Sequence, residues 1–173
     1  MALTPSTMLP LGSALPMALL QEQLTPVCGD PLDADALTIL SEHPAWLKLI
    51  PKGSVLTPHP KEFDRLFGPS TDSIHRWHKQ QEMASQLGLI LVLKGRYTSV
   101  CSAEGVTVFN TTGNPGMAKG GSGDVLTGMI TGFAASGRSM WESVLLAVYL
   151  HGLAGDLAAN WQTETAMLAS ELI

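Results

Sequence analysis

The stretch NTTGNPGMAKGGSGD at residues 110–124 decides how the rest of the sequence is interpreted. It contains five glycines and one proline, it ends on Asp124, and an apolar helical pattern begins directly after it. A glycine run that leads into a helix exposes backbone N–H groups, and the helix dipole makes those groups attractive to anions. The stretch therefore predicts a phosphate cradle formed by the backbone N–H donors of Gly120, Gly121, Ser122 and Gly123. Asp124, at the inner end of the stretch, is placed to accept a proton.

Strand-like segments precede this loop. Residues 89–93 form a continuous apolar run, which is typical of a strand buried on both faces of a parallel sheet. Residues 54–57 form a shorter β-like run. The segments 97–101 and 106–109 are joined by a turn-like SAEG sequence, which predicts a hairpin.

Helical patterns lie between and after these strands. Residues 62–67 and 70–88 show helical spacing, and Ile74 begins the apolar stripe of the second segment. After the loop, one helix is predicted up to Gly137, and a capping box of Ser139 and Glu142 predicts the start of a long final helix. Strands separated by helices indicate an α/β fold, in which ligands gather at the carboxyl ends of the strands.

Three polar residues follow predicted strands and therefore belong to this edge: His59, Lys94 and Asn110. Pro58 and Pro60 fix the backbone on both sides of His59, which favours a functional role. A lone histidine is more often a turn residue or a hydrogen-bonding partner, and that alternative stays open. Lys94 either contacts phosphate or ribose, or only ends a strand.

Asp33 and Asp35 lie just before a short apolar pattern in the sequence PLDADALTIL. We expect at least one of them to be the N-cap of a helix, because aspartate is a preferred residue there. The alternative is a carboxylate at a strand end, near a sugar hydroxyl or a metal ion.

The composition excludes several classes of protein. The 173 residues are 45% hydrophobic and 14% charged, with a net charge of −5, so we expect one well-buried globular domain. A nucleic-acid partner is disfavoured because the chain has no basic run. Neither a secretion signal nor a membrane-spanning run is recognisable, and Cys28 and Cys101 lack metal-ligand spacing, so a cytoplasmic protein with reduced thiols and no membrane partner is expected.

The N-terminal segment does not fit a complete doubly wound fold. Prolines at positions 5, 10, 16 and 26 interrupt it, and only a short helix over residues 17–23 is suggested. A complete fold of this type would usually open with a strand and a glycine-rich turn. We therefore interpret residues 1–31 as an atypical or incomplete segment.

At these motifs the sequence resembles the nucleotide-dependent NAD(P)H-hydrate dehydratases of the ribokinase-like superfamily. The matching segments, in family order, are DADALTIL, LTPHPKEFDRLFG, LVLKGRYTSV, NTTGNPGMAKGGSGDVLTGMITG and VYLHGLAGDLA, followed by Ala169 and Ser170. The resemblance implies a three-layer α/β/α fold with a mostly parallel central sheet. It also implies that residues 32–173 are the C-terminal part of such a domain, truncated at its N-terminus.

The resemblance implies a hydro-lyase that restores NADH or NADPH from its hydrate, NADHX or NADPHX, at the expense of ADP or ATP with Mg²⁺. The hydroxyl on the damaged ring takes up a phosphoryl group, and the ring nitrogen then expels phosphate. By this resemblance Asp124 is the substrate-side base and His59 contacts the hydrate. The implied nucleotide contacts are Lys94, Gly95, Arg96, Tyr97, Thr98 and Gly123, beside the loop and Asn110.

Two other functions stay open from the sequence. One is a ribokinase-like kinase for a vitamin or sugar, in which Asp124 activates a stable alcohol. The other is a non-catalytic fragment that binds nucleotide or associates with an intact partner. Family members commonly oligomerise, which leaves a homo-oligomer as a further expectation.

Overall fold

The computed structural model describes residues 31–173, so the helix suggested at 17–23 and Cys28 lie outside the described residues. A five-stranded sheet with the order β1-β2-β3-β4-β5 forms the centre of this part of the chain. Its strands are β1 (Pro31–Leu32), β2 (Val55–Leu56), β3 (Ile90–Leu93), β4 (Ser99–Cys101) and β5 (Thr107–Phe109).

The first three strands run parallel, and the last two pairings are antiparallel. Val55 pairs with Ile90 in the parallel part, whereas Leu91 pairs with Cys101 and Ser99 with Phe109 in the hairpin part. The predicted strands and the predicted hairpin are therefore confirmed. The described sheet is mixed because the hairpin adds two antiparallel pairings to the parallel start.

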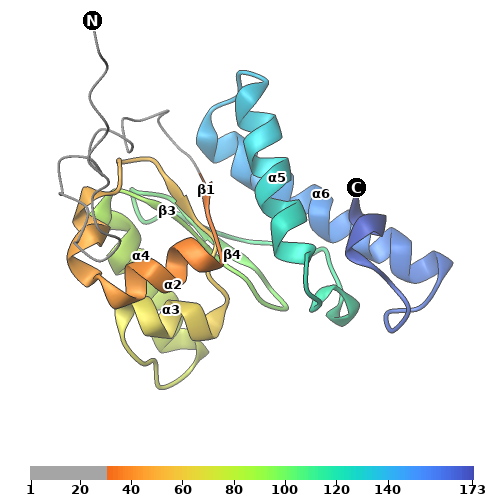
Figure 1. Cartoon of the computed structure of the whole chain (residues 1–173), viewed down its shortest axis with the longest axis horizontal. Coiled ribbons are helices and arrows are strands. Elements are labelled where there is room, and N and C mark those ends of the chain that lie inside the picture. Colours follow the sequence, from red (N-terminus) through yellow and green to blue (C-terminus); the bar gives the residue numbers. More distant parts are fainter. Residues whose placement is uncertain (1–30) are drawn as a thin grey trace, which may run out of the picture.

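Helices cover both faces of the sheet, as Figure 1 shows. On one face lie α2 (Asp35–Glu42), α3 (Pro60–Phe67) and α4 (Ser73–Leu87); on the other lie α5 (Ser122–Ala135) and α6 (Met140–Trp161). Short 3₁₀ helices are η1 (Pro44–Leu49), η2 (Pro115–Met117) and η3 (Ala169–Leu172). This arrangement is the predicted α/β/α layering.

The alternation of strand side chains separates the two cores. Leu56 and Leu91 pack with α2, α3 and α4, whereas Val55, Ile90 and Val92 pack with α5 and α6. Successive side chains of a strand point to opposite faces, so a run that is apolar at every position fits a strand covered on both sides. The prediction made from the apolar run is confirmed.

Helix α4 differs from its prediction on one face. Ile74 is 67% exposed, so the predicted apolar stripe does not begin there. The buried residues of this helix are Ala84, which the predicted stripe included, and Gln80, whose amide donates to the carbonyl oxygens of Leu91 at 2.7 Å and Ser99 at 3.0 Å. The Ser99 hydroxyl donates back to Gln80 at 2.6 Å, which satisfies the buried amide and ties α4 to the β3–β4 hairpin.

The predicted N-cap of α2 is wrong. Ala34 is the N-cap and makes no side-chain capping bond, with φ 47° and ψ −109°. It is the only non-glycine residue with positive φ between residues 31 and 173, and such a conformation costs about 1–3 kcal/mol. Neither Asp33 nor Asp35 caps the helix, because the side chain of Asp33 is engaged elsewhere.

Helix α6 packs directly against the glycine-rich loop. A Cβ atom at Gly152 would lie 2.8 Å from the backbone carbonyl carbon of Thr112, and one at Gly155 would lie 2.7 Å from Cγ of Met117. Real Cβ contacts are essentially never this short, so only glycine allows the approach at position 152, where the contact is with backbone; at position 155 the flexible Met117 side chain would have to move. Gly152 of α6 thus sets how closely the loop backbone approaches the helix, and Gly155 leaves room for the Met117 side chain.

We predict that Gly152→Ala destabilises the protein by about 1–3 kcal/mol, because the added methyl group overlaps the backbone of the loop. Gly128→Ala is the matched control, since a Cβ atom there meets nothing within 4 Å on α5. This control should gain up to about 1 kcal/mol from helix propensity. Urea unfolding of both variants measures the difference, and equal stability would contradict the close packing.

Candidate functional site

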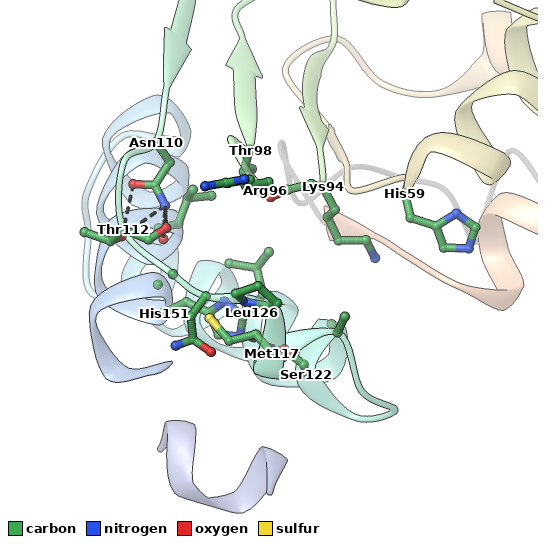
Figure 2. A pocket seen from close by; sticks show the side chains of 18 of the residues that line it. His59, Lys94, Arg96, Thr98, Asn110, Thr112, Met117, Ser122, Leu126 and His151 are labelled. Carbon is green, nitrogen blue, oxygen red and sulfur yellow. Dashed lines mark hydrogen bonds between the residues drawn. The ribbon is translucent and has the colours of Figure 1, made fainter. Parts of the chain in front are cut away.

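A cavity of about 560 Å³ lies at the carboxyl ends of the central strands. Figure 2 shows it between the strand ends that carry His59, Lys94 and Thr98 and the helices that carry Ser122, Leu126 and His151. The volume is within the range of roughly 300–1,000 Å³ that small-molecule sites occupy. The cavity is therefore at the edge where the sequence predicted a ligand.

Helix α5 points an uncapped N-terminus at this cavity. Its N-cap is Gly121, at φ 87° and without a side-chain capping bond, whereas His59, Asp72 and Ser139 cap α3, α4 and α6. A Cβ atom at Gly121 would lie 3.1 Å from Cβ of Ala169, so glycine also fits the space. An uncapped helix N-terminus keeps N–H donors and a partial positive charge for an anion.

Lys94 brings a second positive charge to the same place. It follows β3, and its backbone N–H donates to the Pro58 carbonyl oxygen at 2.9 Å, which continues the parallel pairing. Its ammonium lies 2.8 Å from Oδ1 of Asp33. A Cβ atom at Gly123 would be 3.3 Å from Lys94 Nζ, so the ammonium lies against the first turn of α5.

His59 both caps a helix and lines the cavity. Its Nδ1 accepts from the backbone N–H groups of Lys61 at 3.1 Å and Glu62 at 3.2 Å, and the Glu62 carboxylate accepts from the His59 N–H at 2.7 Å. Pro60 occupies the first helical position. The structural role considered from the sequence is thus real, and His59 is also one of the residues that line the cavity.

The turn between β3 and β4 forms one rim of the cavity. Gly95, Arg96 and Thr98 line it, and the Thr98 hydroxyl donates to the Gly95 carbonyl oxygen at 3.1 Å. Tyr97 is 62% exposed, and the guanidinium of Arg96 lies 5.5 Å from its ring centroid. A cation–π contact at an exposed position is worth about 0.5–1 kcal/mol, so it favours this position of Arg96 only weakly.

Hydrogen bonds of Asn110, at the sheet edge, and Asp156, in α6, help to hold the loop before α5. Asn110 donates from Nδ2 to the carbonyl oxygens of Thr112 at 3.0 Å and Val148 at 3.3 Å. Asp156 accepts from the Gly113 N–H at 2.9 Å and from Nδ2 of Asn114 at 3.2 Å. These bonds fix the glycine-rich loop to α6 before it reaches α5.

A buried histidine completes the wall on the α6 side. Nε2 of His151 lies 3.3 Å from Oγ of Ser122, the first residue of α5. Burial lowers the pKa of His151 below its ordinary value; the hydrogen bond with the Ser122 backbone opposes this shift, and the charge of Lys94 adds to it. His151 is therefore neutral at pH 7 and supports the start of α5 as a hydrogen-bonding partner.

The cavity brings together most of the residues predicted from the sequence. Its lining includes His59, Lys94, Gly95, Arg96, Thr98, Asn110, Ser122 and Gly123, whereas Tyr97, Gly120, Gly121 and Asp124 are outside the lining. Asp124 is exposed in the first turn of α5, on another side of the helix. The roles assigned to all these residues stay predictions.

Some residues of the site were not singled out from the sequence: His151, Thr112 and Met117, which line the cavity, and Asp156, which bonds the loop. The signal for His151 and Asp156 was present in the sequence HGLAGDLA. Its two glycines, three positions apart, mark a helix face that another segment can approach closely. A polar residue on that face can then contact the approaching segment, which in this structure is the glycine-rich loop. A pattern of this kind shows that something packs there without showing which segment does.

Comparisons with known proteins agree on one class. A ribokinase-like superfamily protein from Enterococcus faecalis superposes with a TM-score of 0.70 at 35% identity, over 82% of this chain and 48% of its own. The crystal structure of ADP/ATP-dependent NAD(P)H-hydrate dehydratase from Bacillus subtilis, co-crystallised with ATP/Mg²⁺, gives 0.76 at 36% identity, over 90% and 55%. The fold and the cavity thus define a ribokinase-like α/β protein.

The sequence family described as NAD(P)H-hydrate dehydratase matches residues 11–173, and the chain belongs to this family. The bifunctional NAD(P)H-hydrate repair enzyme Nnr of Moorella thermoacetica is 42% identical over 144 residues, which is 82% of this chain and 27% of that protein. The chain therefore spans between 27% and 55% of the length of these three proteins.

We predict that the protein loses stability below about pH 6.5, the ordinary pKa of histidine, because His151 is buried as the neutral form. Its folded pKa is lowered, so the unfolded chain binds a proton first as the pH falls, and stability decreases until the folded pKa is reached. One such group contributes a slope of at most about 1.4 kcal/mol per pH unit.

Urea unfolding at several pH values checks this prediction, with His151→Gln as the comparison. The variant can keep a hydrogen bond to Ser122 but cannot titrate, so its stability should fall less steeply between pH 6.5 and lower pH. If the stability of the two proteins falls equally steeply with pH, the pH dependence does not come from His151.

Proposed function

We propose that this chain binds ADP or ATP in the cavity and uses it to dehydrate NADHX or NADPHX to NADH or NADPH. The observation that carries the proposal is the uncapped N-terminus of α5, which meets the ammonium of Lys94 at a cavity of about 560 Å³. Membership of the NAD(P)H-hydrate dehydratase family supports the choice of reaction.

The phosphates would bind where the two positive features meet. The N–H groups at the start of α5, in the 120–123 loop, would donate to phosphate oxygens, as helix N-termini preceded by glycine-rich loops do. Lys94 would add charge-assisted hydrogen bonds, which are about twice as strong as neutral ones. A cavity wall without side chains at Gly123 allows the phosphate to approach the backbone.

The remaining cavity suits the nucleoside. Met117, Leu126 and Val148 supply apolar contact area, which a planar base needs, and Thr112 and Arg96 supply polar groups around it. The nucleotide would thus run from the α5 N-terminus towards the rim formed by the β3–β4 turn.

Asp124 would act as the base from the other side of the phosphate. Ser122, Gly123 and Asp124 are the first three residues of α5, and successive residues of a helix project about 100° apart. A phosphate held at the helix end can therefore meet the nucleotide pocket at Ser122 and the hydrate at Asp124. His59, at the neighbouring strand end, would contact the hydrate.

Magnesium would arrive with the nucleotide. Among residues 31–173 no group of three or more His, Cys, Asp or Glu side chains could hold a metal ion alone. Mg²⁺ in nucleotide sites is usually held by phosphates and water with one or two carboxylates, so an ion brought by the phosphates would not need three protein ligands. When bound, the ion would neutralise part of the phosphate charge.

The reaction would proceed in two balanced steps. The ring hydroxyl attacks the terminal phosphorus, its proton passes to the Asp124 carboxylate, and the bond to the departing AMP or ADP breaks. The electron pair of the ring nitrogen then expels the phosphate, and loss of a proton from the adjacent carbon restores the reduced nicotinamide. Asp124 needs only to orient the hydroxyl and accept one proton.

The location and assembly belong to the same proposal. No helix within residues 31–173 has the length and apolar character needed to cross a bilayer. We propose a cytoplasmic location because the substrates are soluble nucleotides, and a homo-oligomer stays a prediction.

The direct test incubates the chain with NADHX, Mg²⁺ and either ADP or ATP. The proposal predicts a return of the reduced nicotinamide absorbance that depends on one of the nucleotides. Nucleotide binding without any return would support the non-catalytic fragment, and a stable phosphorylated alcohol formed from a vitamin or sugar would support the kinase. Either result would contradict the dehydratase.

We predict that Asp124→Asn lowers the rate of dehydration by about a hundred- to ten-thousand-fold, because the base is lost. Nucleotide affinity, measured by titration calorimetry, should stay the same because Asp124 is outside the cavity lining. Glu82→Gln, the same change at an exposed position of α4, is the control and should keep full activity. Full turnover by Asp124→Asn would remove Asp124 from the reaction.

A further inference from the structure

We infer that Asp33 is a positioning residue for the proposed reaction: its carboxylate fixes Lys94 and the first turns of α5 relative to each other. This inference rests on the proposed function and deepens it. It concerns one of the two aspartates that the sequence suggested as an N-cap, and this residue is not part of the cavity lining.

The carboxylate of Asp33 bridges two elements that are far apart in the sequence. Its Oδ1 accepts from Nζ of Lys94 at 2.8 Å, and its Oδ2 accepts from the hydroxyl of Thr127 at 3.3 Å. The side chain of Asp33 is only 9% exposed, and both bonds are partly buried. One buried carboxylate therefore joins the end of β1, the end of β3 and α5.

Gly123 makes this arrangement sterically possible. A Cβ atom there would lie 3.0 Å from Oδ2 of Asp33 and 3.3 Å from Nζ of Lys94. The ion pair thus lies against the backbone of the α5 first turn, beside the proposed phosphate position. Any shift of the pair would move the charge that faces the phosphates.

The backbone next to Asp33 is strained in a way that fits this role. Ala34 has a positive φ of 47° and is not supported by a side-chain cap. An N-capping aspartate at Asp33 or Asp35 would have satisfied the start of α2. The chain instead directs the Asp33 side chain to Lys94 and Thr127, and strain of this kind is kept where surrounding contacts hold it.

The pairing leaves Lys94 able to bind phosphate. An ammonium has three N–H donors, and the bond to Asp33 uses one of them, so two remain for phosphate oxygens. Asp33 therefore restricts the direction of Lys94 without removing its binding capacity. Loss of the carboxylate should disturb alignment more than affinity.

Steady-state kinetics with ADP or ATP test this distinction in Asp33→Asn. We expect kcat to fall by between about tenfold and a hundredfold, as small misplacements of catalytic groups do. The KM for the nucleotide should rise by less than about threefold, because the charge of Lys94 remains. Asp35→Asn, two residues away and exposed, is the matched control and should behave as the unchanged protein.

A double-mutant cycle shows whether Asp33 acts through Lys94. In a Lys94→Met background, Asp33→Asn should change kcat by less than about twofold, because the group that it positions is gone. Independent, additive losses would overturn the inference. A raised Mg²⁺ requirement in Asp33→Asn would also overturn it, since that result would make Asp33 a metal ligand.

A measurement without ligand keeps the inference separate from the proposed function. Amide hydrogen exchange at Val125, Leu126 and Thr127 should become about tenfold faster in Asp33→Asn, because the bond that holds this turn is weakened. Thr127→Val should have the same effect, and Thr127→Ser should restore protection. Unchanged exchange would refute the role of Asp33 even if the chain has no dehydratase activity.

Discussion

The structure depends on how the start of α5 is held without a cap of its own. Gly121 offers no side chain to the first turn, so the helix is positioned by contacts with other elements. Ser122 meets His151 of α6, Thr127 meets Asp33, which follows β1, and the preceding loop is bonded to Asp156. No side-chain cap therefore occupies the donors of this helix end, although the Ser122 N–H is bonded to the Lys119 carbonyl oxygen at 3.4 Å, and the position of the helix is fixed.

Close packing and polar contacts share this task. The glycines of α6 at positions 152 and 155 bring the loop near enough for Asp156 to accept its N–H groups. Packing sets the distance between the loop and α6, and the hydrogen bonds set the orientation of the loop. An exposed charge near a helix N-terminus contributes only about 0.3–1 kcal/mol, whereas a hydrogen bond to a charged group contributes about 1.5–3 kcal/mol. A backbone N–H that donates to a phosphate also makes a hydrogen bond to a charged group, so the α5 donors and Lys94 would contribute to phosphate binding on the same scale.

Local features could be predicted from the sequence because their cause is local. The apolar run at 89–93, the hairpin after it and the capping box of Ser139 each form the predicted element. His59 also lies where the flanking prolines predicted, at the end of β2 and beside the cavity. Each of these patterns is set by residues within one element.

The contacts that could not be predicted from the sequence join segments that are far apart in the chain. Asp33 and Lys94 are 61 positions apart, and Asp33 and Thr127 are 94 apart, so no periodicity links them. The same holds for Gly113 and Asp156, at a separation of 43. Local rules favoured an N-cap at Asp33, and a tertiary ion pair overrode them. The sequence thus allows the sheet edge and the glycine-rich loop of the candidate site to be predicted, but not the long-range hydrogen bonds that align them.

The most direct test of this account is a crystal structure of the chain with ADP and Mg²⁺. The account predicts the terminal phosphate at the start of α5, with its oxygens within about 3 Å of the Gly123 N–H and of Nζ of Lys94. The Asp33–Lys94 pair should stay intact beside it. Phosphates bound away from α5, or a nucleotide outside the cavity, would contradict the account.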